Sequence, residues 1–148
     1  IEDIPDKVVV WAHFRHDIEK ITAKLGELYG ESTVVHYYGA TTDDDRSIAR
    51  RRFRDDEKCR FFVASEATAA YGLNELVVSN QVIYYSYGYN LAHWLQSQDR
   101  NHRIGQNRVV TYITMAIAKT IDVRILKALQ DKNNLAESIL GQLKRLLL

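Results

Sequence analysis

The sequence has 148 residues, enough for one domain with a substantial core, and its 46% hydrophobic and 26% charged residues are ordinary for a globular protein. The formal net charge of +1 gives no overall attraction to nucleic acid, so any basic surface must be local. The single cysteine, Cys59, excludes an internal disulfide and suits a reducing compartment, and no apolar run is long enough to predict a membrane span.

The first part of the chain alternates between strand and helix patterns. Residues 7–12 form a short β-branched apolar run, typical of a strand buried on both faces. Residues 14–29 place apolar side chains at helical spacing and predict an amphipathic helix that ends at Gly30. Residues 33–38 predict the second strand.

The alternation continues with a helix start signal. Thr42 followed by Asp45 resembles a capping box, so a second helix should begin there and continue through Phe53. Residues 60–64 and 81–86 predict the third and fourth strands.

The last part of the chain predicts one more strand and three helices. The first helix has an apolar edge of Leu91, Trp94 and Leu95 that runs into an arginine-rich segment, and residues 109–115 predict the fifth strand. Apolar residues at helical spacing mark two closing helices at about 120–148: Ile121, Ile125 and Leu129 in one, and Leu135, Ile139, Leu143 and Leu146 in the other. Strand–helix alternation implies parallel β-α-β units with right-handed crossovers. We therefore predict one doubly wound α/β domain over residues 1–148, with a mostly parallel central sheet flanked by helices in three layers.

The arginine-rich segment runs from Gln96 to Gln106 and carries Arg100 and Arg103, three residues apart. If it is helical, Gln96, Arg100 and Arg103 share one face. Guanidinium groups suit phosphate because their planar donors can bind two oxygens at once, and pairs of this kind serve as arginine fingers in phosphoryl transfer. The alternative is a solvated helix whose arginines pair with acids such as Asp99.

The pattern Q-x-x-x-R-x-x-R-I-G-Q of this segment resembles the last conserved motif of Swi/Snf-type DNA translocases in helicase superfamily two. The likeness covers nearly the whole chain in the expected order. Residues 38–42, followed by Arg46 and Phe53, are similar to the family's G-S-T … R … F segment. Residues 65–74 are similar to its S-T-x-A-G-G-x-G-L-N segment.

The chain also departs from the family pattern. Thr68-Ala69-Ala70 replaces the usual Ala-Gly-Gly and removes two glycines where backbone often approaches a ligand, whereas Gly72-Leu73-Asn74 is intact. Residues 11–14 resemble the family's I-F-S-Q-F segment only loosely. Thr120, Asp122 and Lys132 resemble the closing helix of bacterial and phage-like members, which implies a cytoplasmic protein of prokaryotic or phage origin.

The resemblance implies a RecA-like fold and the role of a second motor lobe. ATP and Mg²⁺ would be bound mainly by a first RecA-like lobe of the same protein, with Arg100 and Arg103 acting on the γ-phosphate and Gln96, Gly72 and Asn74 near the nucleotide. Phosphates of one strand of duplex DNA would be held by Gly39, Ala40, Thr41, Arg46 and Ser65. Contacts of this kind carry little sequence preference because they read the backbone.

The sequence lacks the signals of a first lobe. No glycine is followed by Lys and Ser or Thr, so a phosphate-cradling loop is not predicted. The acids at 55–57 follow a predicted helix rather than a buried strand, where a magnesium-binding acid normally lies. Because a strand follows so soon after Ile1, we interpret the chain as a piece of a larger protein that does not hydrolyse ATP by itself.

The arginine cluster of the second predicted helix and the overall function each have alternative interpretations. The cluster of Arg46, Arg50, Arg51, Arg52 and Arg54 could hold phosphates, or it could pair with the acids that flank it. His13 and His16 have no third ligand at metal spacing, so no metal site is predicted. Two other functions also compete with a translocase: a strand-separating helicase of the same superfamily, and a non-catalytic module that binds nucleic acid or protein.

Overall fold

The computed structural model describes residues 6–146, with the side chains of that range apart from 69–71 and 141–146. Its centre is a parallel sheet of five strands in the order β2-β3-β1-β4-β5. Each strand lies inside its predicted run, so the predicted sheet is confirmed. The bounds are β1 Val8–Trp11, β2 Val34–Tyr37, β3 Phe61–Ala64, β4 Gln81–Tyr84 and β5 Thr111–Thr114.

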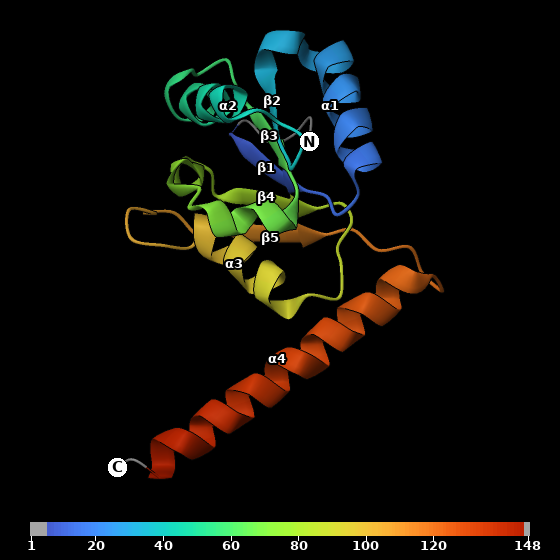
Figure 1. Cartoon of the computed structure of the whole chain (residues 1–148), viewed down its shortest axis with the longest axis vertical. Coiled ribbons are helices and arrows are strands. Elements are labelled where there is room, and N and C mark those ends of the chain that lie inside the picture. The colour runs from blue at the N-terminus through green and yellow to red at the C-terminus, as the bar shows by residue number, and fades with distance from the viewer. Residues whose placement is uncertain (1–5, 147–148) are drawn as a thin grey trace.

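Helices cover both faces of the sheet, as the α/β prediction requires. Helix α1 lies on one face, whereas α2 and α3 lie on the other (Figure 1). Two short 3₁₀ helices, η2 and η3, make the crossover from β3 to β4 on the face of α2 and α3. The bounds are α1 Arg15–Tyr29, η1 Glu31–Thr33, α2 Asp43–Asp55, η2 Glu66–Tyr71, η3 Asn74–Val78, α3 Leu91–Asn101 and α4 Ile121–Leu146.

The two cores follow from the alternation of side chains along each strand. Val8 and Val10 of β1 pack with Ile18 of α1, whereas Val9 of the same strand belongs to the cluster that contains Phe53 of α2. Strands of a parallel sheet are buried on both faces, so they need apolar residues at consecutive positions rather than at alternate ones. This explains why β1 and β3 read as unbroken apolar runs.

Local signals set the helix ends near the sheet. The Thr42 hydroxyl accepts a hydrogen bond from the backbone N–H of Asp45 at 3.2 Å, and donates to the carboxylate of the same residue at 2.7 Å. The bond from the Asp45 N–H satisfies one of the free N–H groups at the start of α2 and confirms the predicted cap. Helix α1 ends at Tyr29 and is capped by Gly30, whose φ of 99° is a conformation that favours glycine.

Two predictions about helices are wrong. Helix α3 ends at Asn101, so Arg103 lies in the following turn and not on one helical face with Gln96 and Arg100. The closing segment is the single helix α4 instead of two helices, because no glycine or proline interrupts residues 121–140.

Helix α4 packs on the domain only near its start and then extends away from it (Figure 1). Ile125 and Leu129 are buried, whereas Leu135 and Ile139 are exposed. The side chains of Leu143 and Leu146, which were predicted to belong to the last helix, lie outside the described ones. Within residues 6–146, no helix combines the length and the hydrophobicity needed to cross a bilayer.

Candidate functional site

The arginine motif lies near the amino-terminal edge of the sheet. Helix α3 begins beyond the carboxyl end of β4, where Asn90 caps it by accepting from the His93 N–H at 3.2 Å, and it ends before β5 begins. Arg100 occupies the last turn of α3, and Arg103 the turn after it. Loops at the carboxyl ends of strands usually hold the ligands in such a fold. The arginines thus lie at the opposite edge of the sheet from the loops that follow β2 and β3.

Three of the residues predicted to lie near the nucleotide come together at this end. Arg103 donates a hydrogen bond from Nη1 to Oδ1 of Asn74, which begins η3. The N–H of Asn74 in turn donates to the carbonyl of Gly72 at 2.8 Å. Gly72 has φ 68° and ψ 44°, the left-handed conformation in which L side chains are strained. Gly72, Asn74 and Arg103 thus form one cluster, which we call the Arg103 cluster.

Gln96 and Arg100 lie one turn apart on α3, as predicted from helical spacing. The Oε1 atom of Gln96 and the Nε atom of Arg100 are both buried without a hydrogen-bond partner among the described residues. Neither Arg100 nor Arg103 forms an ion pair with Asp99 or any other acid within residues 6–146. The interpretation of these arginines as surface ion pairs is therefore not supported.

The amides of the motif hold the Arg103 turn against the loop before β4. The Asn101 side chain donates to the carbonyls of Leu76 at 2.9 Å and Ser79 at 3.1 Å. The Gln106 side chain donates to the carbonyls of Val77 and Ser79, both at 3.0 Å. Because these bonds satisfy carbonyls on the η3 segment, they fix the position of Arg103 relative to Asn74.

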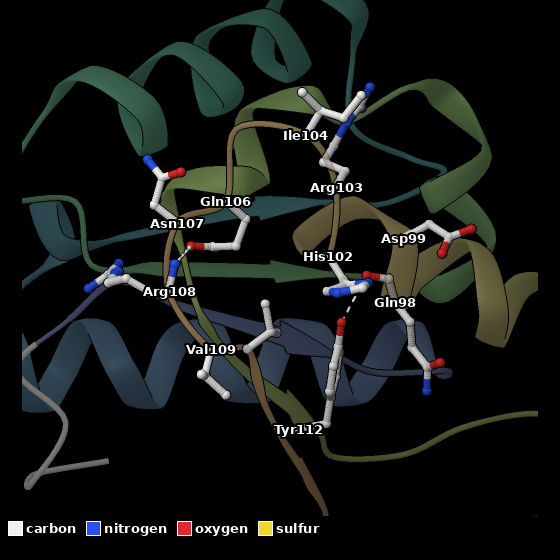
Figure 2. A pocket seen from close by; sticks show the side chains of 11 residues that line it. Gln98, Asp99, His102, Arg103, Ile104, Gln106, Asn107, Arg108, Val109 and Tyr112 are labelled. Carbon is white, nitrogen blue, oxygen red and sulfur yellow. Dashed lines mark hydrogen bonds between the residues drawn. The ribbon is translucent and has the colours of Figure 1, made fainter.

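A hollow of about 840 Å³ opens between the end of α3 and β5, with Arg103 and Ile104 at its rim (Figure 2). Its wall is fixed by the hydrogen bond from the Tyr112 hydroxyl to the Gln98 carbonyl at 3.0 Å. Burial raises the pKa of Tyr112 to about 12, so this phenol stays neutral. Of the two arginines in the lining, Arg108 pairs with an acid, Asp6, at 2.9 Å, whereas Arg103 bonds to a neutral amide.

A second hollow, of about 320 Å³, lies at the carboxyl edge of the sheet; we call it the carboxyl-edge hollow. Three of the residues predicted to hold DNA phosphates line it: Gly39 and Ala40 after β2, and Ser65 after β3. The other lining residues are His13, Arg15, Ile18, Tyr38, Glu66 and Ala67. Parallel strands bring these loops to one edge, which is why positions far apart in the sequence meet here.

The other two residues predicted to contact DNA lie behind the loop after β2. Thr41 is buried, and its hydroxyl accepts from the Tyr38 N–H at 3.2 Å. Arg46 donates to the carbonyls of Tyr38 at 3.3 Å and Gly39 at 3.2 Å, and pairs with Asp43 at 3.3 Å. Only 18% of the Arg46 side chain is exposed. Both side chains therefore shape the loop and leave its backbone facing the hollow.

Three of the four remaining arginines of α2 have partners, whereas Arg51 is exposed and forms no ion pair within the described residues. Arg50 lies 3.9 Å from Glu75 and Arg54 lies 2.7 Å from Asp55. Arg52 donates to the carbonyl of Ser32 at 2.7 Å. For these three residues the interpretation as neutralised or structural arginines is favoured over a phosphate-binding cluster.

Glu66 is a site residue that the sequence analysis did not single out. It is 2% exposed, and its Oε2 accepts a hydrogen bond from the Gly88 N–H at 3.4 Å. Burial raises the pKa of Glu66 to about 7, and the Gly88 bond only partly opposes this shift. The signal available in the sequence was its position: this acid lies two residues after the end of the buried strand β3, where the family pattern has Thr.

Neither a metal site nor a reactive thiol is indicated in the described part of the chain. No group of three or more His, Cys, Asp or Glu side chains there is arranged to hold a metal ion. Cys59 is a buried free thiol, and burial raises its pKa, which disfavours the reactive thiolate. The exposed guanidinium of Arg103 is a group that can bind phosphate oxygens.

Comparison with known proteins gives a consistent result. Residues 1–105 match the family model described as "Helicase conserved C-terminal domain". The chain is 38% identical over 102 residues to "Helicase SWR1" of Candida glabrata, and 35% identical over 99 residues to "Helicase domino" of Drosophila melanogaster. It is 28% identical over 136 residues to "ATP-dependent helicase fft3" of Schizosaccharomyces pombe. These matches cover 69%, 67% and 92% of the chain.

A solved structure matches the fold as well. The "Crystal structure of the C-terminal part of Fun30 ATPase domain" is similar with a TM-score of 0.75 and 25% identity, over 83% of this chain and 38% of that one. The chain spans only 7%, 3% and 14% of the SWR1, domino and fft3 relatives, respectively. All three relatives are eukaryotic, and they lend no support to the predicted prokaryotic or phage origin.

Proposed function

Since the chain belongs to the helicase conserved C-terminal domain family and is of the Swi/Snf type, we propose that it is the second motor lobe of an ATP-dependent DNA translocase. In this proposal a first RecA-like lobe of the same protein holds ATP and Mg²⁺. The present lobe supplies Arg100 and Arg103 to the phosphates across the cleft between the lobes, and grips the backbone of duplex DNA at its carboxyl edge. The buried Cys59 thiol is consistent with a reducing compartment.

The observation that carries the proposal is that Arg103 is held in place but not neutralised. Its guanidinium is exposed, is oriented by the neutral amide of Asn74, and has no acidic partner within the described residues. The bonds of Asn101 and Gln106 to the η3 segment fix the turn that carries it. A cation that is positioned in advance and not neutralised can stabilise charge that develops on a transferring phosphoryl group, because it needs no reorganisation during the reaction.

The carboxyl-edge hollow supports the DNA part of the proposal. Gly39 and Ala40 expose backbone there, and the Ser65 hydroxyl has no partner among the described residues. Backbone N–H groups and hydroxyls are common phosphate ligands, and they carry no direct sequence information. We therefore expect weak affinity for duplex DNA without sequence preference, falling as salt rises because counterions are released on binding.

The test of the nucleotide role is Arg103→Ala in the intact two-lobed protein. If Arg103 acts mainly in the transition state, kcat and kcat/KM for ATP should fall together, by about two or more orders of magnitude, with little change in KM. Arg103→Lys should rescue this loss only in part, because a compact ammonium cannot reproduce the planar fork. Arg124→Ala, which removes an exposed arginine of α4, is the matched control and should keep wild-type turnover.

Thermal melts of the same preparations separate function from structure. A structural role for Arg103 would lower the melting temperature while turnover per folded molecule stayed near wild type, and that result would refute the assignment. Residues 1–148 alone should not hydrolyse ATP, with or without DNA. A strand-displacement assay on the full protein then distinguishes translocation along a duplex from strand separation.

A further inference from the structure

The carboxyl-edge hollow contains an acid where the proposed ligand is an anion. Glu66 lines the hollow together with Gly39, Ala40 and Ser65, the loop residues assigned to the DNA backbone. An ionised carboxylate at this position would repel a phosphodiester, and the low dielectric of a buried site strengthens the repulsion. The residues that would bind the phosphate and the residue that would oppose it therefore share one wall.

The hydrogen bonding of Glu66 leaves one of its oxygens available. Oε2 accepts from the Gly88 N–H, whereas Oε1 is buried without a hydrogen-bond partner among the described residues. A neutral carboxylic acid keeps one acceptor oxygen and gains one O–H donor. Glu66 lines the hollow, and its terminal torsion is soft, so the O–H can reorient without a change in the backbone. A donor of this kind can bind a phosphate oxygen.

We propose that Glu66 is a further DNA-backbone contact that acts in its protonated form, so that binding of a phosphodiester in the carboxyl-edge hollow takes up one proton at this carboxyl. The proposal rests on the DNA contact of the proposed function and adds its dependence on pH. Because burial already raises the pKa of Glu66 to about 7, the neutral form is available near neutral pH. The proton comes from solvent and returns to it on release.

Other titratable groups surround Glu66 and have to be separated from it. Tyr84 in β4 and Tyr87 after it lie close enough to Glu66 to feel its charge. Burial raises the pKa of both phenols, that of Tyr87 to about 12, so both stay neutral below about pH 9. The ring of His13 packs so closely on Gly88 that a Cβ there would lie 2.5 Å from it. His13 also lines the hollow, so its contribution has to be measured separately.

The charged residues on the α1 side of the hollow are linked to one another. Arg15 lines the hollow and pairs with Glu19 at 2.7 Å, and Glu19 also accepts from the Tyr38 hydroxyl at 3.1 Å. Pairing with Arg15 lowers the pKa of Glu19, so that carboxylate keeps its charge throughout the relevant range. Asp17, on the same helix, accepts from the Ser86 hydroxyl at 2.7 Å. This leaves Glu66 and His13 as the two groups to test.

The experiment measures the affinity of residues 1–148 for a fluorescent 20-base-pair duplex by anisotropy, at constant ionic strength between pH 6 and pH 8. The wild-type chain should bind about tenfold more weakly at pH 8 than at pH 6, as expected for one proton taken up near pH 7. Glu66→Gln, which cannot ionise, should lose most of this dependence and bind several-fold more tightly than wild type at pH 8. His13→Asn should keep most of the wild-type dependence.

Glu57→Gln is the matched control, because it changes the net charge equally at an exposed residue beyond α2. A Glu66→Gln chain with the pH dependence of wild type, or with no more gain at pH 8 than Glu57→Gln, would overturn the proposal while leaving the DNA contact intact. Loss of the dependence in His13→Asn alone would assign it to the imidazole and overturn the proposal equally. If folded wild-type chain binds no duplex at any of these pH values, the DNA contact of the proposed function fails as well.

Discussion

Replacement of Glu66 by Gln should stabilise the fold at pH 8 but not at pH 4, independently of any ligand. The pKa of Glu66 is raised from its ordinary 4.5 to about 7 in the folded chain because the carboxyl is buried. Between these two values the folded chain keeps a proton that the unfolded chain has released. The free energy of unfolding of wild type should therefore fall as pH rises from about 4.5 to about 7, and this contribution should be constant above that range.

The size of the effect follows from the shift itself. A difference of one pKa unit corresponds to about 1.4 kcal/mol, so the full shift of Glu66 predicts about 3 kcal/mol of lost stability at pH 8. Glu66→Gln removes the ionisable group but keeps an oxygen that can accept from the Gly88 N–H. The variant should thus exceed wild type by about 3 kcal/mol at pH 8 and differ little from it at pH 4.

Urea unfolding of both chains at pH 4, 6 and 8 measures this difference, with Glu57→Gln as the control for net charge. Titrations that affect both chains equally cancel in the comparison. If the difference between Glu66→Gln and wild type is the same at all three pH values, Glu66 does not titrate between them, and the account of its burial is refuted. A variant less stable than wild type at pH 8 would refute it too.

Three further substitutions test the packing and the geometry of the site by urea unfolding. Phe53→Ala removes a fully buried ring that contacts Phe62, with ring centroids 5.2 Å apart. It should lower the free energy of unfolding by about 3 to 5 kcal/mol, and a loss under about 1 kcal/mol would contradict the described core. Gly72→Ala adds a methyl group that meets nothing within 4 Å, so only the left-handed backbone conformation opposes it. The substitution should cost about 1 to 2 kcal/mol of unfolding free energy. No loss of stability would show that this backbone conformation is not required. Asn101→Ala takes two hydrogen bonds from the carbonyls of Leu76 and Ser79 and should cost about 1 to 3 kcal/mol, and unchanged stability would mean that these bonds do not hold the η3 segment.

The sequence predicted the sheet and the site to different extents. All five strands were located. β1 and β3 are buried throughout, and such strands are short apolar runs that need no knowledge of their partners. β5 is a largely exposed edge strand, and its β-branched and aromatic residues favour a strand. The start of α2 was located for a similar reason, since Thr42 and Asp45 interact across three residues of chain. The extent of α3 was not, because its end depends on Asn101 and Gln106 binding carbonyls more than 20 residues earlier.

The sequence by itself determined the family pattern, the order of the elements and the residue types suited to phosphate, since these depend on local spacing along the chain. Only the tertiary structure decided which of those side chains face outward. Arg46 was expected to hold a DNA phosphate, but the structure turns its side chain to the carbonyls of Tyr38 and Gly39. The structure also joined Arg103 to Asn74, 29 residues earlier. It also buried Glu66 beside Gly88, and burial, which raises the pKa of a carboxyl, arises only when distant segments pack around it and exclude water.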